Sequence, residues 1–78
     1  MIKIFTTQYC GYCRMAKSFL EGKKLKYHEF DVAEDAKAAK EMVELSGQRG
    51  VPVMVIGKKI IVGFDEKEIE RALAEKEG

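Results

Sequence analysis

Both cysteines of the chain lie in one short segment, Cys10-Gly11-Tyr12-Cys13. An apolar, β-prone run at residues 1–5 precedes this segment, and residues 14–20 follow it with the spacing of an amphipathic helix. Cysteines three residues apart at a helix start lie on one face, so their sulfurs can form a disulfide with little backbone movement. The sequence therefore predicts a strand, a short turn and a helix whose first turn carries both thiols.

This position favours a reactive thiolate at Cys10. The first backbone N–H groups of a helix have no carbonyl partner, and the helix dipole is positive at that end. Arg14 and Lys17 add positive charge near it, whereas Cys13 lies one turn further in and is expected to be more covered. We predict that Cys10 is the nucleophile, that Cys13 is the resolving thiol, and that the reaction is thiol–disulfide exchange.

Two other uses of the cysteine pair are less favoured. A structural disulfide across so short a loop removes little entropy from the unfolded chain, so it would stabilise the fold only weakly. A zinc site within one chain needs four ligands, and only the lone His28 could join the two cysteines. His28 is expected to face outward from a strand as an ordinary surface residue. We therefore predict no metal site.

Length and charge restrict the partners. A chain of 78 residues is expected to form a single domain, 1–78, with one core. Its 14 basic and 13 acidic side chains give no broad field for nucleic acid or an anionic membrane. No apolar run reaches membrane-span length and no signal-peptide pattern is present, which predicts a cytoplasmic location. In that reducing compartment a cysteine pair is more often catalytic than structural.

The hydrophobic pattern predicts four strands, at 2–7, 25–30, 53–56 and 59–62, of which the first is central. Three helices are expected, from the cysteines to Gly22, over 34–45, and after residue 65. Asp65 with Glu68 three residues later is a capping pattern, and Asp65 could both cap this helix and bind a ligand. The methionines at 15, 42 and 54 are expected to fill the core.

Taken together, these motifs resemble the glutaredoxin branch of the thioredoxin fold. The resemblance rests on the order β-α-β-α-β-β-α, with Cys-x-x-Cys at the first helix, Val51-Pro52 before the third strand and Gly63-Phe64-Asp65 after the fourth. It covers the whole chain and implies an α/β fold with a four-stranded mixed sheet flanked by helices. It also implies a cis peptide at Val51–Pro52 and an active site in which the three motifs meet.

The same resemblance implies roles for the site residues. Val51 and Pro52 would dock the substrate backbone beside Cys10. The groove around them would be lined by Tyr12, Arg49, Gly63, Phe64 and Asp65. The implied activity is reduction of protein disulfides or glutathione mixed disulfides by a monomer, with glutathione as co-substrate and no tightly bound cofactor.

The motifs differ in the electron source that they imply. Cys-x-Tyr-Cys and Asp65 are similar to glutathione-using glutaredoxins, but three positions depart from that pattern. The usual lysine three residues before the first cysteine is Thr7, the threonine of Thr-Val-Pro is Gly50, and the first glycine of a Gly-Gly pair is Val62. The overall likeness is to short prokaryotic glutaredoxin-like proteins with a Ser-Gly-Gln-x-Gly-Val-Pro-Val stretch.

Two alternatives therefore stay open. Arg49 and Gly63-Phe64 resemble redoxins that serve ribonucleotide reductase and are recharged by thioredoxin reductase, although the Arg-Pro that usually follows is Asp65-Glu66 here. Gly11 replaces the proline of Cys-Pro-Tyr-Cys, and some glutaredoxins with a small residue there bridge an iron–sulfur cluster. Two chains, each giving Cys10, and two glutathiones would supply the four thiolates.

Overall fold

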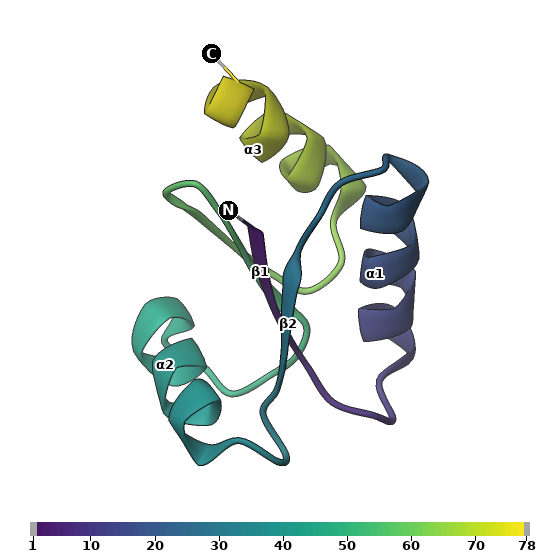
Figure 1. The fold of residues 1–78 in the computed structure, drawn as a ribbon. Helices are drawn as coiled ribbons and strands as arrows, with labels where there is room; N and C mark the ends of the chain where they lie inside the picture. The colour runs from purple at the N-terminus through teal and green to yellow at the C-terminus, as the bar shows by residue number, and fades with distance from the viewer. Residues whose placement is uncertain (1, 78) are drawn as a thin grey trace.

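A computed structural model describes residues 2–77 of the chain, with side chains described as far as residue 75. The chain forms seven elements in the predicted order (Figure 1). They are β1 Ile2–Thr6, α1 Gly11–Gly22, β2 His28–Asp31, α2 Ala36–Ser46, β3 Val53–Ile56, β4 Lys59–Val62 and α3 Glu66–Glu77. The predicted thioredoxin-like architecture is confirmed.

The sheet is mixed, with strand order β2-β1-β3-β4. β1 is parallel to β2 and antiparallel to β3, and β3 is antiparallel to β4. β1 is therefore internal, as predicted from its apolar run. Because β1 and β3 run in opposite directions, with Phe5 paired to Val53, the end of β1 lies beside the start of β3. The cysteine segment and Pro52 consequently emerge at the same end of the sheet.

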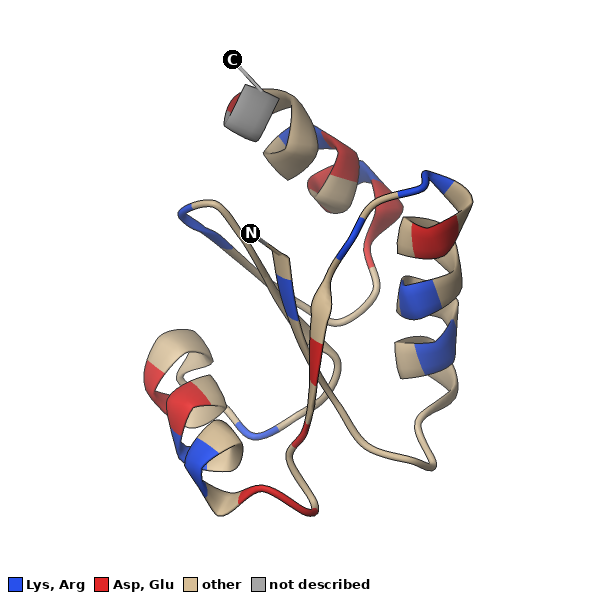
Figure 2. Ribbon diagram, viewed as in Figure 1, with Lys and Arg blue, Asp and Glu red and all other residues tan. Residues whose placement is uncertain are grey.

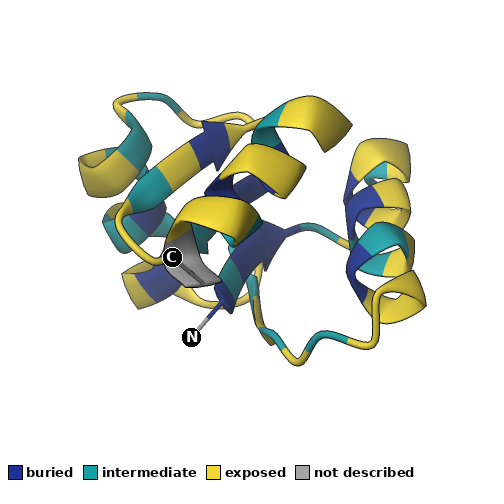
Figure 3. Ribbon diagram, turned by 90° about the horizontal axis from the view of Figure 1, so that it is seen from above, coloured by how far each residue is buried: buried dark blue, intermediate teal, exposed yellow. Residues whose placement is uncertain are grey.

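Helices cover both faces of the sheet. α1 and α3 lie on one face and α2 on the other, with the buried residues between the layers (Figures 1 and 3). Alternate residues of β1 point to opposite faces, so Ile4 joins the α1–α3 core and Phe5 joins the α2 core. The first core is the larger and is formed by Ile2, Ile4, Ala16, Leu20, Met54, Ile56, Ile61, Ile69 and Ala72. The second is formed by Phe5, Ala38, Met42 and Val53.

Side-chain caps define the starts of the helices. Asp35 accepts hydrogen bonds from the N–H groups of Lys37 and Ala38 at 3.0 and 3.1 Å, which begins α2. The Asp65 carboxylate accepts the N–H of Glu68 at 3.2 Å, so the predicted capping pattern is confirmed. Gly47, with φ of 73°, ends α2 in the left-handed conformation that glycine adopts readily.

Two sequence predictions are wrong. Met15 does not fill the core: its side chain is 50% exposed, because the buried positions of α1 are Cys13, Ala16 and Leu20 on the adjoining face. β2 begins at His28 rather than at residue 25. Leu25 and Tyr27 pack against the α1–α3 core from the connecting loop, so their apolar character reflects burial and not strand pairing. His28 is exposed, as predicted.

Charged residues of both signs are distributed over all three helices (Figure 2). Ion pairs join elements that are distant in sequence, including Lys3 with Glu41 and Lys17 with Glu29, each at 2.9 Å. Across residues 2–77, no helix has the length and apolar character needed to cross a membrane.

Candidate active site

Cys10 is the N-cap residue of α1. Its backbone is extended, with φ of −102° and ψ of 111°, and its Sγ accepts the N–H of Cys13 at 3.1 Å. A sulfur that caps a helix lies where unpaired N–H groups and the helix dipole favour negative charge. Both cysteines are free thiols, and Cys10 is partly exposed. The predicted placement of both thiols in the first turn is confirmed.

Cys13 lies beneath Cys10 and is fully buried, with no exposed side-chain surface. Burial, followed by a hydrogen bond with the Cys10 side chain, raises the pKa of the Cys13 thiol to about 12. The backbone of Thr7 and the charge of Lys17 act in the opposite direction on this pKa, but with smaller effect. Cys13 is therefore a protonated thiol at neutral pH.

Lys17 is held by a carboxylate that links three elements. Its Nζ pairs with the Glu29 carboxylate at 2.9 Å, and the same oxygen accepts a hydrogen bond from the buried Thr6 hydroxyl at 2.7 Å. The hydrogen bonds from Lys17 and Thr6 hold the pKa of Glu29 below its usual value. The charge that Lys17 adds near the thiols is thus partly offset by Glu29, and α1 is tied to β1 and β2.

The Val51–Pro52 peptide bond is cis, as the resemblance implies. The Val51 carbonyl lies 3.8 Å from Cys10 Sγ, which donates to it as a weak hydrogen-bond donor. The Pro52 carbonyl in turn accepts the N–H of Gly63 at 2.8 Å. Two contacts therefore connect the three predicted motifs in space: Cys10 contacts Val51, and Pro52 contacts Gly63.

The remaining predicted site residues lie in separate hollows or at the exposed start of α3. Tyr12 is 64% exposed and lines a shallow hollow with Gly11 and Met15. The half-buried Phe64 packs edge-on against Phe19, with ring centroids 5.9 Å apart, and borders a hollow between α1 and the start of α3.

Arg49 lies on the other side of the sheet from that hollow. It lines a pocket of about 490 Å³ on the α2 face, together with Val32, Met42 and Val43. Asp65 is exposed at the start of α3. The structure thus brings together the backbone motifs at Cys10, and places Arg49 and Phe64 in different hollows.

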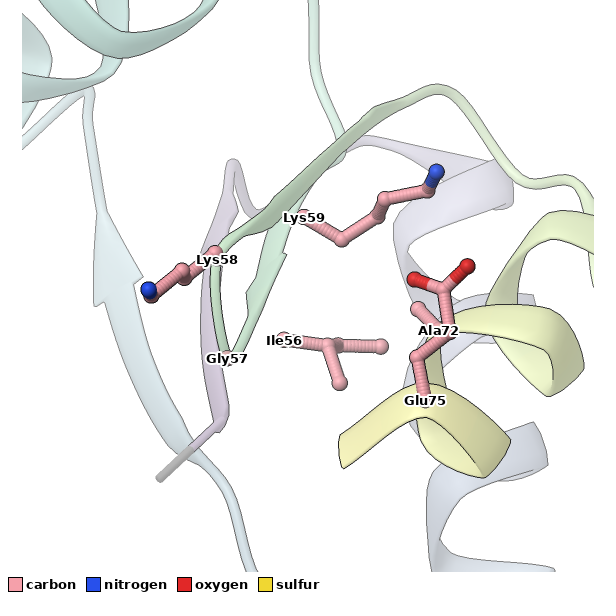
Figure 4. Close-up of a pocket in the computed structure, with 6 residues that line it drawn as sticks. All are labelled: Ile56, Gly57, Lys58, Lys59, Ala72 and Glu75. Carbon is pink, nitrogen blue, oxygen red and sulfur yellow. The ribbon is translucent and has the colours of Figure 1, made fainter. Parts of the chain in front are cut away.

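A further pocket lies far from the thiols, between the β3–β4 turn and α3 (Figure 4). It has a volume of about 410 Å³ and includes Ile56, Lys59, Ala72 and Glu75 in its lining. β3 runs from Val53, next to Pro52, to Ile56, so this pocket is at the opposite end of the strand. It takes no part in the arrangement around Cys10.

The sequence reasoning missed Gln48, whose side chain bonds to the backbone just before the cis peptide. The available signal was Gly50, which stands where glutathione-using relatives carry threonine. It also missed Thr6 and Glu29, for which the sequence offered no signal, because their contact depends on the parallel pairing of β1 with β2.

A sequence model of the glutaredoxin family matches residues 2–61. The chain belongs to the glutaredoxin family. The family's general activity is thiol–disulfide exchange, and Cys10 with Cys13 fits its Cys-x-x-Cys motif.

Three proteins illustrate what this glutaredoxin is similar to. A glutaredoxin-like 8.6 kDa protein in the rubredoxin operon of Clostridium pasteurianum is 42% identical over 73 residues, covering 94% of this chain and 97% of its own. Glutaredoxin 3 of Escherichia coli K12 is 32% identical over 65 residues, covering 83% and 78%. The structure of the glutaredoxin-like NrdH-redoxin from E. coli, described as having a thioredoxin-like activity profile, matches with a TM-score of 0.81. It is 27% identical and covers 90% of this chain and 91% of its own.

The different environments of the two thiols predict selective alkylation of this glutaredoxin. We expect iodoacetamide to modify the reduced protein once, at Cys10, at pH 7–8, because Cys13 is buried and its pKa is about 12. Mass spectrometry of the digested protein identifies the modified residue. In guanidinium chloride both residues should react, which serves as the control. Equal modification of Cys13 in the folded protein would contradict the described burial.

The same pKa predicts a loss of stability in alkali. The ordinary pKa of a cysteine is 9.0, so below pH 9 Cys13 is protonated in both the folded and unfolded states. Between pH 9 and about 12 the unfolded state loses this proton first, so the contribution of the group to stability falls as pH rises.

Proposed function

We propose that this protein is a dithiol oxidoreductase that reduces protein disulfides or glutathione mixed disulfides. One observation carries the proposal. Cys10 Sγ caps α1 and is partly exposed, while Cys13, whose N–H it accepts at 3.1 Å, is buried and protonated. One thiol is thus suited to attack and the other is protected from competing substrates.

The proposed reaction has two exchanges. The Cys10 thiolate attacks one sulfur of the substrate disulfide; the Cys10–substrate bond forms, the substrate S–S bond breaks, and the departing sulfur takes a proton from solvent. Cys13 then loses its proton to solvent and attacks Cys10 Sγ. The Cys10–substrate S–S bond breaks, the second substrate sulfur leaves and takes a proton from solvent, and the Cys10–Cys13 disulfide remains. Two electrons pass from the thiol pair to the substrate.

The environment of Cys13 favours attack by Cys10 first and by Cys13 second. Besides burial, which has the largest effect, the hydrogen bond with Cys10 and the charge of Cys10 both raise the pKa of Cys13 in the reduced protein. Once Cys10 is bonded to a substrate sulfur, it carries no negative charge and both influences weaken. Cys13 therefore releases its proton more readily after the first exchange than before it.

The substrate is proposed to lie across Val51 and Pro52, with its disulfide next to Cys10. The cis peptide and the 3.8 Å contact between the Val51 carbonyl and Cys10 Sγ support this placement. Tyr12 and Asp65 are exposed and Phe64 is half-buried, and we propose that all three contact the substrate. Arg49 would act at the α2 side of the same end of the sheet.

We propose glutathione as the electron source, on the strength of Tyr12, Asp65 and the similarity to glutaredoxin 3. Thioredoxin reductase is the second candidate, with ribonucleotide reductase among the acceptors. The similarity to NrdH-redoxin favours it, as do Thr7, Gly50 and Val62 in place of the residues that glutathione-using glutaredoxins carry.

The deciding experiment measures NADPH consumption by the pure protein with a disulfide substrate. One reaction contains glutathione and glutathione reductase, and the other contains thioredoxin reductase alone. We expect turnover in the first. Turnover in the second alone would replace glutathione by thioredoxin reductase as the electron source. Absence of turnover in both would reject the oxidoreductase function.

A further inference from the structure

The Gln48 side chain closes a small ring with the backbone of Gly50. Gln48 Nε2 donates to the Gly50 carbonyl at 3.0 Å, and the Gly50 N–H donates to Gln48 Oε1. One carboxamide thus engages both backbone groups of Gly50, much as a neighbouring strand would. Residues 47–52, between α2 and β3, lie outside the sheet, so no strand supplies these bonds.

This ring is anchored to the end of α2. The Ser46 hydroxyl donates to the Met42 carbonyl at 2.6 Å and accepts from Gln48 Nε2 at 3.1 Å. Met42 is buried in the α2 core. The position of the Gln48 carboxamide is therefore set from a fixed part of the fold and not by the loop alone.

A side chain at residue 50 is disfavoured by the contact with Gln48 and not by the backbone conformation of Gly50. Its φ is outside the left-handed region, so other residues could adopt its conformation. A Cβ at this position, however, would lie 2.7 Å from Gln48 Oε1, closer than real Cβ contacts, and no backbone atom lies within 4 Å. Any side chain here must push the carboxamide aside. Glycine at residue 50 therefore leaves room for the Gln48 carboxamide, at a position where glutathione-using glutaredoxins carry threonine.

The next residue along the chain is Val51, whose carbonyl accepts the Cys10 thiol at 3.8 Å. We infer that Gln48 is a positioning residue for disulfide exchange: by holding both backbone groups of Gly50, it fixes Val51 and Pro52 beside Cys10. Because Gln48 already engages both the N–H and the carbonyl of Gly50, the substrate backbone forms hydrogen bonds with Val51 and not with Gly50. This inference rests on the proposed function, in which the substrate docks on Val51.

The test uses Gln48→Ala, Gly50→Ala and the double variant. Gly22→Ala is the matched control, because a Cβ at Gly22 meets no atom within 4 Å. The assay is NADPH-coupled reduction of insulin disulfides with whichever reductase supports the wild type. Each single variant should raise KM about fivefold to tenfold, the effect of roughly one or two lost hydrogen bonds, with kcat changed less than about twofold.

The double variant should resemble either single variant, because both remove the same interaction. Gly22→Ala should leave KM unchanged. An unchanged KM in Gln48→Ala, or effects that multiply in the double variant, would overturn the inference. Changes in kcat with constant KM would also overturn it, since they would indicate an effect on Cys10 and not on docking.

A second measurement needs neither activity nor variants. Gly50 is exposed, so its amide should exchange rapidly with solvent unless Gln48 holds it. We expect amide hydrogen exchange of the wild type, followed by NMR, to show Gly50 at least about tenfold slower than the exposed Arg49 amide. Rapid exchange at Gly50 would reject the role of Gln48 even if turnover is normal. Slow exchange without turnover would reject the proposed function and leave the Gln48–Gly50 contact in place.

Discussion

Replacing Cys10 by serine is expected to lower turnover by about three orders of magnitude or more, to the rate of uncatalysed exchange. A serine hydroxyl is not ionised at neutral pH and does not form the mixed disulfide that the proposed reaction requires. Serine is, however, a good N-cap residue, so its Oγ can accept the Cys13 N–H that Cys10 Sγ accepts now. The loss should therefore occur in a folded protein, as shown by an unchanged circular dichroism spectrum.

Cys13→Ser is the informative companion variant. It retains the attacking thiol, so the mixed disulfide at Cys10 should form and accumulate with protein disulfides. When the substrate is itself a glutathione mixed disulfide, attack by a second glutathione on the Cys10–glutathione bond releases the enzyme directly. We expect reduction of protein disulfides to fall sharply while glutathionylated substrates are still turned over. A Cys10→Ser protein that keeps wild-type turnover, or a Cys13→Ser protein with no defect on any substrate, would refute these assignments.

Leu20→Ala should destabilise the fold by about 2–5 kcal/mol. Leu20 is fully buried in the α1–α3 core, where its loss leaves a cavity under the helix that carries the thiols. A chain of 78 residues has a free energy of unfolding of about 4–12 kcal/mol, so this one change removes a large part of it. Urea denaturation should show a lower midpoint with a similar slope, and the Tm should fall by about 4–8 °C for each kcal/mol lost.

Met15→Ala is the control on the same helix. Its side chain is half exposed, so truncation should cost less than about 1 kcal/mol. If Leu20→Ala and Met15→Ala lowered the free energy of unfolding equally, Leu20 would not be the better-packed residue. The comparison also tests a helix residue whose burial was wrongly predicted from the hydrophobic pattern.

Patterns of residues close together in the sequence were sufficient to predict most of the helices and strands. The apolar run of β1, the β-branched run of β3 and the glycine turn before β4 lie within a few residues of the features that they specify. The cap at Asp65 and the helix end at Gly47 are equally local. Cys10 and Cys13 could be placed because the helix start alone determines their relation.

The errors and omissions concern interactions between segments. Apolar pattern alone cannot distinguish Leu25 and Tyr27 in a buried loop from the same residues in a strand, because both bury the side chain. Met15 adjoins the buried face of α1, and the hydrophobic pattern of the helix alone does not define the edge of that face. The ring between Gln48 and Gly50 involves neighbours in sequence, but its carboxamide geometry has no hydrophobic signature.

The candidate active site lies where two separately packed layers meet. α1, with both sulfurs, rests on one core, whereas Val51 packs against the α2 core on the other face. The pairing of β1 with β3 aligns the two, since Phe5 opposite Val53 brings both loops to one end of the sheet. During evolution, the interiors of the two layers can therefore diverge in sequence largely independently, and selection for chemistry falls on the strand register that joins them.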